Sequence, residues 1–518
     1  MRKRAPVVVA VLLILALSGM PAHGAGQESG QWSMAGQNLD NTRHQAGEDT
    51  LVSGTVGSMV SKWVFEAGGD ISATPTVFGG AVYFPDFGGN LWKLDAQSGT
   101  VIWSRQISDY TGMPGAISRV SPVIAGNKLI LGDQFGAHIM AVDRNTGDLM
   151  WKTNVDSHFA AVITQSPVVF GNRVFVGISS LEEGFAADPG YVCCTFRGSV
   201  VSLDVNTGAL LWKTYTVPEG YSGGAVWGST PVVDKKRKAI YVTTGNNYEV
   251  PDEVAACAEA AGPEHAEDCL APDDYIDAFL ALDMNTGAVK WGRRIQGFDA
   301  WTVACFFLPP GVTWCPSPMG PDYDFGQGPA LFSVEIDGHK RDLLGAGQKS
   351  GIYWALDPDT GEIVWSSLVG PGSALGGMQW GSATDGKRIY VAISNLEHKP
   401  YTLPDGTTAN AGSWAALDAA TGQILWQTPD PMSSFVTAPV TVAGGVVYGG
   451  SMDPQGHMYA FDAATGEILW SFVAGGSVNG GAAVVNGTVY WGSGYANLGL
   501  GTPNNKLFAF GLPPTSEE

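Results

Sequence analysis

Charged residues are scarce in this sequence, and basic residues are scarcer than acidic ones. Only 15% of the 518 residues are charged, and 49 acidic against 28 basic side chains give a formal net charge of −21 at pH 7. So acidic a surface is repelled by the phosphates of nucleic acids and by anionic membranes. We therefore expect no nucleic-acid partner and no anionic membrane partner.

Long hydrophobic runs are missing as well, apart from one near the N-terminus. This run covers residues 5–17, follows three basic residues and precedes the small residues Ala22 and Gly24. It is too short to span a membrane and has the pattern of a secretory signal peptide. We expect residues 1–24 to be the signal peptide and residues 25–518 to form one mature domain without a membrane span.

Cysteine is rare too, with six residues, and no Cys-x-x-Cys-His motif occurs, which excludes covalently attached haem c. In an exported chain, disulfides are the default. Cys257–Cys269 and Cys305–Cys315 are each the nearest pair within a segment that departs from the repeat described below, which leaves Cys193 and Cys194 for each other. Adjacent Cα atoms lie about 3.8 Å apart, below the usual disulfide range, so that bond is strained and a different pairing stays open.

The most informative pattern that is present is a repeat, Asp-x-x-Thr/Ser-Gly followed four residues later by Trp. Each copy is typical of a hairpin, in which an apolar strand leads into a turn closed by Asp and Gly and a second strand carries the Trp. Such a unit, repeated every 40 to 80 residues or so, predicts a β-propeller. The seven copies are Asp95/Gly99/Trp103, Asp143/Gly147/Trp151, Asp204/Gly208/Trp212, Asp283/Gly287/Trp291, Asp357/Gly361/Trp365, Asp418/Gly422/Trp426 and Asp462/Gly466/Trp470.

The two ends of the chain supply an eighth unit. Residues 60–65 resemble the Trp-bearing strand without a preceding turn, and residues 506–510 resemble the strand that precedes such a turn. We therefore predict an all-β, eight-bladed β-propeller that is closed by the N- and C-terminal strands. Closure removes exposed sheet edges, and the repeated Trp residues are expected to pack between neighbouring blades.

Three segments outside the repeat carry a resemblance to a known family. The opening segment Trp32 to Arg43, the segment Ala225-Val-Trp227-Gly-Ser and the segment Ile240-Tyr-Val-Thr-Thr-Gly-Asn246 are similar to segments of the alcohol dehydrogenases that depend on PQQ, pyrroloquinoline quinone. Within this family, the sequence looks most similar to the polyvinyl alcohol dehydrogenase group. The resemblance implies an eight-bladed periplasmic enzyme that binds PQQ and a metal ion at the centre of the ring.

The resemblance assigns Trp227 to the face of the quinone and Asn246 to the metal. A planar cofactor gains dispersion energy on an indole ring, and a hard cation takes amide oxygens. The alternative for Trp227 is packing in the core.

The segment Val176-Gly-Ile-Ser179-Ser-Leu-Glu182-Glu183 matches the family stretch that supplies a metal-binding Glu and a Ser in contact with the quinone. Thr164 aligns with another hydroxyl that contacts the quinone. Because adjacent side chains on an extended segment point to opposite sides, only one Glu is expected to face the metal. The alignment favours Glu182 as the metal ligand, and Glu183 stays open.

The segment Pro321-Asp322-Tyr323-Asp324-Phe325-Gly326 resembles the family element that carries the catalytic base, here Asp324, which is also expected to bind the metal. Oxidation of an alcohol requires removal of the hydroxyl proton, and a positioned carboxylate can accept it. Asp322 is interpreted as a turn or rim residue, and Asp299 is a competing candidate for the base. Gly326 stands where members that use lanthanides carry a second Asp, which favours Ca²⁺.

Two cations and the adjacent cysteines complete the expected site. Lys349 matches a catalytic cation beside the reactive quinone oxygens, where it would stabilise negative charge on the reduced ring. Arg119 matches an Arg that pairs with a carboxylate of the cofactor. Cys193 and Cys194 stand after Glu182, whereas relatives that oxidise methanol carry their adjacent pair just before that Arg. We expect the pair to lie over the cofactor.

The sequence thus predicts a periplasmic enzyme, dependent on PQQ and Ca²⁺, that oxidises secondary hydroxyls of an alcohol such as a polymer. A separate cytochrome c is the expected electron acceptor. Two alternatives stay open. One is a quinoprotein dehydrogenase for sugars or small alcohols, and the other is a propeller without catalytic activity that serves as a scaffold in envelope assembly.

Overall fold

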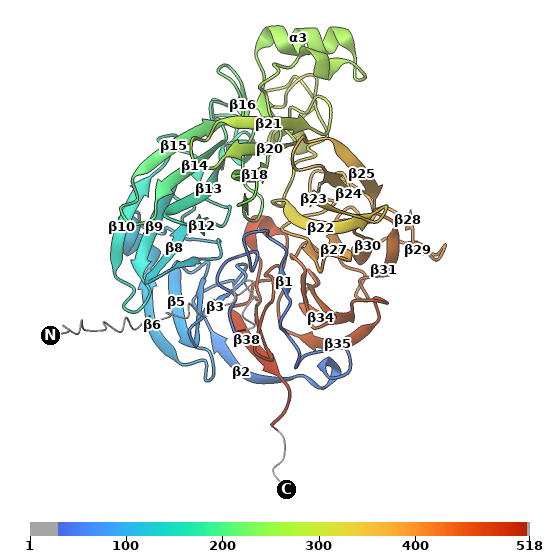
Figure 1. Cartoon of the computed structure of the whole chain (residues 1–518). Helices are drawn as coiled ribbons and strands as arrows, with labels where there is room; N and C mark the ends of the chain where they lie inside the picture. Colours follow the sequence, from blue (N-terminus) through green and yellow to red (C-terminus); the bar gives the residue numbers. More distant parts are fainter. Residues whose placement is uncertain (1–29, 515–518) are drawn as a thin grey trace, which may run out of the picture.

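The computed structural model describes residues 30–514, and these residues form a ring of sheets around a central axis (Figure 1). Eight sheets with four main strands each follow one another around this axis, so the predicted eight-bladed, all-β propeller is confirmed. The expected signal peptide at residues 1–24 lies outside the described residues. Within residues 30–514, no helix has the length and apolar character that crossing a membrane requires.

The blades are numbered here in chain order, and each forms an antiparallel sheet. Blades 1 to 4 consist of β3 (Thr76–Phe78), β4 (Ala81–Pro85), β5 (Asn90–Asp95) and β6 (Val101–Gln106); β7 (Val123–Ala125), β8 (Lys128–Gly132), β9 (His138–Asp143) and β10 (Leu149–Asn154); β12 (Val168–Phe170), β13 (Arg173–Ser180), β14 (Ser199–Asp204) and β15 (Leu210–Tyr215); and β17 (Val232–Asp234), β18 (Ala239–Thr243), β20 (Ala278–Asp283) and β21 (Val289–Arg294).

Blades 5 to 8 consist of β22 (Ala330–Ile336), β23 (His339–Gly347), β24 (Ile352–Leu356) and β25 (Ile363–Leu368); β26 (Ala383–Thr384), β27 (Arg388–Ile393), β30 (Ser413–Asp418) and β31 (Ile424–Pro429); β32 (Thr441–Ala443), β33 (Val446–Gly450), β34 (His457–Asp462) and β35 (Ile468–Val473); and β36 (Ala483–Val485), β37 (Thr488–Gly492), β38 (Lys506–Gly511) and β2 (Val60–Glu66). The short strands β1 (His44–Gln45) and β11 (Ala161–Val162) extend blades 7 and 3.

Blade 8 joins the two ends of the chain. Strand β2 pairs antiparallel with β38, and Trp63 lies opposite Ala509 in this register. The prediction that the terminal strands close the ring is therefore confirmed. Closure pairs the edge that each terminal strand would otherwise expose.

The repeated Asp and Gly form the turn between the third and fourth strands of a blade. In blade 1 the Oδ1 atom of Asp95 accepts hydrogen bonds from the N–H groups of Gln97 at 3.1 Å and Ser98 at 2.8 Å. The Gly99 N–H donates to the Asp95 carbonyl at 2.9 Å. Gly99 has φ 71°, a left-handed conformation in which a residue without Cβ is unstrained.

The repeated Trp residues pack between neighbouring blades, as predicted. The Trp151 Nε1 atom donates to the Val205 carbonyl at 3.1 Å, and a Cβ on Gly208 would lie 2.5 Å from the Trp151 ring. The same close approach recurs around the ring, including that of Trp63 on the closing strand to Gly99. Each turn glycine thus makes room for an indole from the preceding blade.

This contact predicts the effect of a methyl group. We expect Gly208→Ala to lower the free energy of unfolding by about 2 to 4 kcal/mol, because overpacking against Trp151 adds to the cost of a left-handed alanine. Urea denaturation measures the loss. Gly80→Ala is the matched control, since Gly80 has φ 75° but a Cβ added there would meet no atom within 4 Å. Equal losses in the two variants would contradict the packing explanation.

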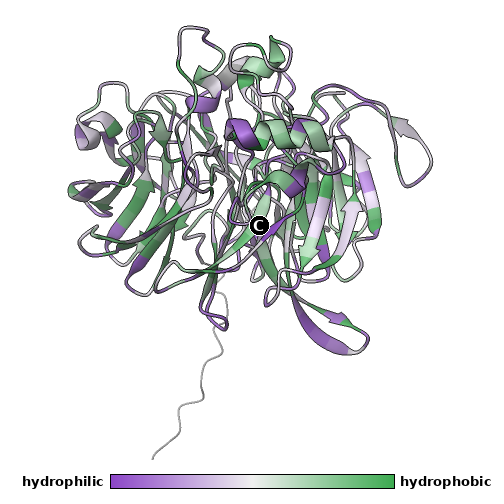
Figure 2. Ribbon diagram, turned by 90° about the horizontal axis from the view of Figure 1, so that it is seen from above, coloured by the Kyte–Doolittle hydropathy of each residue, from purple (hydrophilic) through white to green (hydrophobic). Residues whose placement is uncertain are grey.

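The remaining elements belong largely to insertions between strands. In the edge-on view, helical turns lie along one broad side of the disc (Figure 2). Disulfides join Cys193–Cys194, Cys257–Cys269 and Cys305–Cys315, so the predicted pairing is confirmed. The helices and short strands outside the blades are α1 (Ile107–Thr111), α2 (Glu182–Phe185), α3 (Asp252–Ala261), η1 (Val56–Ser58), η2 (Ala266–Cys269), η3 (Val303–Phe306), η4 (Asn497–Gly499), β16 (Ser222–Gly223), β19 (Asn247–Glu249), β28 (Tyr401–Thr402) and β29 (Thr408–Ala409).

Candidate active site

Asp324 is held in the middle of the candidate site by three neighbours. Its Oδ2 atom accepts a hydrogen bond from Trp227 Nε1 at 2.8 Å, and its Oδ1 atom accepts one from the backbone N–H of Asn246 at 2.9 Å. The Nζ atom of Lys349 lies 3.6 Å from Oδ2. A Cβ on Gly245 would lie 2.7 Å from the same oxygen, so only glycine fits there. The structure therefore brings together four residues that are far apart in the sequence.

Lys349 is the single cation of this group, and it forms a buried ion pair. Its Nζ atom lies 2.7 Å from Asp322 Oδ1, and both side chains are almost fully buried. Burial alone would lower the pKa of Lys349, but the negative charges of Asp322, Asp324 and Glu183 raise it above its usual value. Lys349 is therefore charged. The interpretation of Asp322 as a rim residue is wrong, because its carboxylate lies inside the site.

Asp299, the competing candidate for the base, supports the loop that carries Asp324. Its two carboxylate oxygens accept hydrogen bonds from the N–H groups of Asp322 at 3.1 Å and Tyr323 at 2.8 Å. Burial raises the pKa of Asp299 to about 6. A second buried carboxyl group, that of Asp277, lies nearby. Burial is the main cause that raises the pKa of Asp277, and the negative charge of Asp299 raises it further. These hydrogen bonds show that Asp299 positions the loop of Asp324, and its candidacy as the base stays open.

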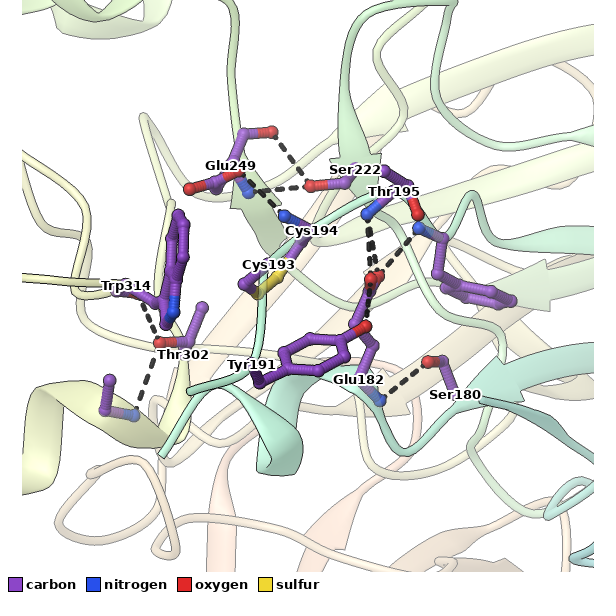
Figure 3. Close-up of a disulfide and its surroundings, with 12 residues drawn as sticks. Ser180, Glu182, Tyr191, Cys193, Cys194, Thr195, Ser222, Glu249, Thr302 and Trp314 are labelled. Atoms are coloured by element: carbon purple, nitrogen blue, oxygen red, sulfur yellow. Dashed lines mark hydrogen bonds between the residues drawn. A yellow bond between two sulfur atoms is a disulfide. The ribbon is translucent and has the colours of Figure 1, made fainter. Parts of the chain in front are cut away.

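Glu182 does not face this group. Its carboxylate accepts hydrogen bonds from the Tyr191 hydroxyl at 2.7 Å and from the backbone N–H groups of Thr195 at 2.9 Å and Phe196 at 2.7 Å (Figure 3). Burial alone would raise the pKa of Glu182, but these hydrogen bonds, together with one from His158, lower it. Glu182 anchors the loop that follows Cys194, and its role as a metal ligand stays a prediction.

Glu183 lies near enough to the aspartates for their charges to act on its carboxyl group. Burial, followed by the negative charges of Asp324 and Asp299, raises the pKa of Glu183 to about 8 against the opposing charge of Lys349. Glu182 and Glu183 begin the short helix α2 and are not part of an extended segment, so the alternation of side chains along a strand does not apply to them. The two glutamates thus lie in different surroundings, and Glu183 is the one that is close to the aspartates.

Aromatic and hydroxyl groups surround Trp227, the residue that donates to Asp324. The rings of Trp227 and Trp380 meet edge to face with centroids 5.3 Å apart, and the Arg119 guanidinium lies 4.0 Å from the Trp380 ring centroid. The Thr164 hydroxyl donates to the Trp227 carbonyl at 3.4 Å. Ser179 lies near the end of β13, and its hydroxyl has no hydrogen-bond partner among residues 30–514.

Arg43 is a second buried arginine, and sequence reasoning missed its position. It lines a cavity of about 50 Å³ together with Arg119, Thr164 and Trp380. Its guanidinium donates to the carbonyls of Val440 and Ala35 and to two threonine hydroxyls, and burial lowers its pKa to about 9. Neither arginine forms an ion pair with a carboxylate of the described residues. A larger cavity of about 430 Å³ lies elsewhere, and no predicted site residue lines it.

The adjacent cysteines lie in the loop that Glu182 anchors. The Cys194 N–H donates to Glu249 Oε2 at 2.9 Å, and Cys193 is buried against residues of the 301–319 segment such as Cys315 (Figure 3). Cys194 and Trp227 pack against the same apolar cluster.

The donor set fits a hard cation that shares its ligands with a cofactor. The Asn246 amide nitrogen donates to the carbonyls of Asn247 at 2.9 Å and Trp301 at 2.8 Å, which leaves its Oδ1 atom without a partner among the described residues. Within residues 30–514, no three His, Cys, Asp or Glu side chains are arranged to hold a metal alone. Two carboxylates, from Glu183 and Asp324, and one amide oxygen therefore need further oxygen ligands.

The site is also polarised in a way that suits an anionic cofactor with a cation. Around Asp324, several carboxyl groups surround the single cation Lys349. Around Trp380, the buried Arg43 and Arg119 lack carboxylate partners among the described residues. Buried charges are stable only when they are compensated. A divalent cation on the acidic side and carboxylates on the basic side would provide this compensation.

The fold and the site define a class of protein, the eight-bladed propellers of the quinoprotein type. The family model described as outer membrane protein assembly factor BamB matches residues 46–187 and 349–509. A polyvinyl alcohol dehydrogenase of a Pseudomonas species is 31% identical over 93% of this chain and 77% of its own length. The enzyme of that name from Sphingopyxis sp. strain 113P3 is 31% identical over 93% of this chain and 76% of its own length.

Among solved structures, the quinohemoprotein alcohol dehydrogenase ADH-IIG of Pseudomonas putida HK5 shares the fold. Its TM-score is 0.72 over 95% of this chain and 81% of that chain, at 18% identity. The sequence match to the two enzymes above is closer, and it extends over nearly the whole chain. This chain therefore belongs to the polyvinyl alcohol dehydrogenase family.

Proposed function

We propose that this protein is a periplasmic alcohol dehydrogenase, dependent on PQQ and Ca²⁺, that oxidises secondary hydroxyls. The observation that carries the proposal is the buried Asp324 carboxylate, held between Trp227, Asn246 and Lys349. The names of its relatives support the reaction class. The expected signal peptide supports export, and a separate cytochrome c is proposed as the electron acceptor from the family resemblance alone.

We assign the metal to Asn246, Asp324 and Glu183, with Glu183 replacing Glu182. All three supply oxygen ligands, which Ca²⁺ prefers in a flexible shell of six to eight. Gly326 supports Ca²⁺ over a lanthanide, because a Cβ there would lie 2.7 Å from Gln379 Oε1 and 3.0 Å from the Trp227 ring. A second aspartate at this position therefore has no room.

In the proposed reaction, Asp324 accepts the hydroxyl proton of the alcohol. When bound, PQQ would supply a quinone carbonyl that accepts the hydride from the carbon bearing this hydroxyl. The Lys349 Nζ atom lies 5.3 Å from the centroid of the Trp227 ring, so its positive charge would stabilise negative charge on a quinone held beside it. Asp299 keeps the Asp324 loop in place, and Arg119, Thr164 and Ser179 are proposed to hold the cofactor, with Cys193 and Cys194 above it.

The test of this function is uptake of the cofactor by the apo-protein. PQQ should bind only when Ca²⁺ is present, because the protein and the quinone share the ion. Absorbance titration with and without Ca²⁺, followed by assay against a panel of alcohols with an artificial acceptor, measures both steps. Folded protein that binds no PQQ would favour the scaffold alternative, which the BamB family model supports. Turnover of sugars alone would favour the other alternative.

A pair of glutamate variants tests the revised metal assignment. Glu183→Gln should weaken Ca²⁺-dependent PQQ uptake by about tenfold or more, because an amide replaces a charged ligand. Glu182→Gln should keep the Ca²⁺ dependence but lower protein stability by about 1 to 3 kcal/mol, because the N–H groups of Thr195 and Phe196 then donate to a neutral amide and no longer to a carboxylate. Calcium titrations and thermal unfolding of both variants measure the difference. The reverse pattern would restore Glu182 as the ligand.

A further inference from the structure

Beside the candidate site the chain exposes a set of apolar side chains, which we call the aromatic rim. Phe159, Val192 and Phe307 are the most exposed of them, at 69%, 79% and 74%. Large apolar side chains so open to water cost free energy unless they serve as a binding surface. The aromatic rim consists of Phe159, Phe185, Tyr191, Val192, Phe306 and Phe307.

The rim is an organised surface. The rings of Phe159 and Phe185 stack with centroids 6.2 Å apart, and each also contacts Tyr191, at 5.9 Å and 5.8 Å. Phe306 contacts the buried Trp301 at 4.8 Å and Phe307 at 6.5 Å. The exposed rings are therefore held by rings that are themselves anchored in the fold.

The rim is continuous with the site. Tyr191 donates its hydroxyl hydrogen bond to Glu182, which holds the loop of Cys193 and Cys194 (Figure 3). Tyr191 also packs in one cluster with Cys193 and with Trp314 of the segment that carries Phe306. The Cys305–Cys315 disulfide closes this second segment. The link to the candidate site runs through Trp301, which contacts the Phe306 ring at 4.8 Å and whose carbonyl accepts a hydrogen bond from the Asn246 amide at 2.8 Å.

A polymer is the occupant that this placement fits. When one carbon of a long chain lies at Asp324, the stretches on both sides of it must leave the site across the surrounding surface, whereas a small alcohol does not reach that surface. Uncharged alkyl segments gain free energy against aromatic rings and are not repelled by the acidic protein. A protein partner usually contacts about 20 to 30 residues a side, far more than the six side chains of the rim.

We propose that the aromatic rim binds the alkyl stretches of a polymeric secondary alcohol on either side of the hydroxyl that is oxidised. This inference rests on the proposed function and deepens it, because it assigns polymer selectivity to residues outside the reaction centre. The rim contributes only when the substrate is long enough to cross it.

The test is the double variant Phe159→Ser/Phe307→Ser of the enzyme reconstituted with PQQ and Ca²⁺. The ratio of kcat/KM for polyvinyl alcohol to kcat/KM for 2-butanol should fall about tenfold, because two aromatic contacts are lost. The matched control is Leu368→Ser/Val473→Ser, which removes apolar side chains that are 66% and 52% exposed on outer strands of the ring. An unchanged ratio in the rim variant, or an equal change in the control, would overturn the proposal.

A binding measurement separates the rim from the reaction. The fluorescence anisotropy of dye-labelled polyvinyl alcohol reports binding without turnover, and its affinity should fall about tenfold in the rim variant. If wild-type enzyme oxidises no alcohol yet binds the polymer through the rim, the proposed function fails and the rim stands. If light scattering finds a wild-type dimer that the rim variant dissociates, a second copy is the occupant and the rim proposal is wrong.

Discussion

Asp324→Asn is expected to leave a folded protein that takes up PQQ but has a kcat at least about a hundredfold lower. An amide cannot accept the substrate proton at neutral pH, and loss of a general base costs about a hundredfold or more. The amide offers one acceptor oxygen to two donors, so either Trp227 Nε1 or the Asn246 N–H loses its partner. We therefore also expect a stability loss of about 1 to 3 kcal/mol. Steady-state kinetics and thermal unfolding measure the two effects.

Asp299→Asn is the informative comparison for this variant. The Asp299 carboxylate accepts hydrogen bonds from the N–H groups of Asp322 and Tyr323. Replacing Asp299 by Asn should therefore loosen the loop of Asp324 and lower kcat less than Asp324→Asn does. If Asp299→Asn were inactive while Asp324→Asn kept near-normal turnover, Asp299 would be the base and the assignment of Asp324 would be wrong.

Lys349→Met is expected to have the second large effect, on both stability and turnover. It leaves the Asp322 carboxylate buried without its cation, and breaking such a pair costs about 3 to 5 kcal/mol. The pKa of Lys349 is raised on folding, so its stabilising charge is fully present below its unfolded pKa and is lost only at strongly alkaline pH. At pH 5 the deficit of the variant should be smaller than at pH 8, because Asp322 can then take a proton.

The double variant Lys349→Met/Asp322→Asn separates the two roles of Lys349. Removing the orphaned charge should restore most of the stability, while turnover stays at least about tenfold below wild type because the cation beside the Trp227 ring is still absent. Urea denaturation at pH 5 and pH 8 and steady-state kinetics measure both. Recovery of turnover together with stability would show that Lys349 acts only as a structural partner of Asp322.

The fold could be predicted almost completely because its information is local and repeated. The spacing of Asp95, Gly99 and Trp103 specifies a turn, a left-handed glycine and an indole that packs on the neighbouring blade, and each element reappears in the structure. The pairing of β2 with β38 followed from the N-terminal Trp-bearing strand, which lacks the preceding strand and turn that the other copies of the repeat have. The disulfides followed because the nearest cysteines lie within the same insertion.

The candidate site was predicted in composition but not in detail. Sequence patterns named Trp227, Asn246, Asp324 and Lys349, and the structure brings these four together. They gave Arg43 no role in the site, because the small cavity that it lines is formed by residues distant in sequence, such as Arg119, Thr164 and Trp380. They also left Asp299 as a competitor of Asp324, although it supports that residue's loop.

The sequence by itself thus determined the number of blades, the closure of the ring and the disulfide pairs, because each depends on short-range spacing, whereas the residues of the candidate site were named through the family resemblance. Only the tertiary structure decided that Glu183 and not Glu182 lies close to the aspartates, and that Asp322 is buried against Lys349. The physical reason is that a helical turn at α2 and the packing of separate loops fix where a carboxylate points and which charges surround it. Neither can be read from the order of residues along one segment.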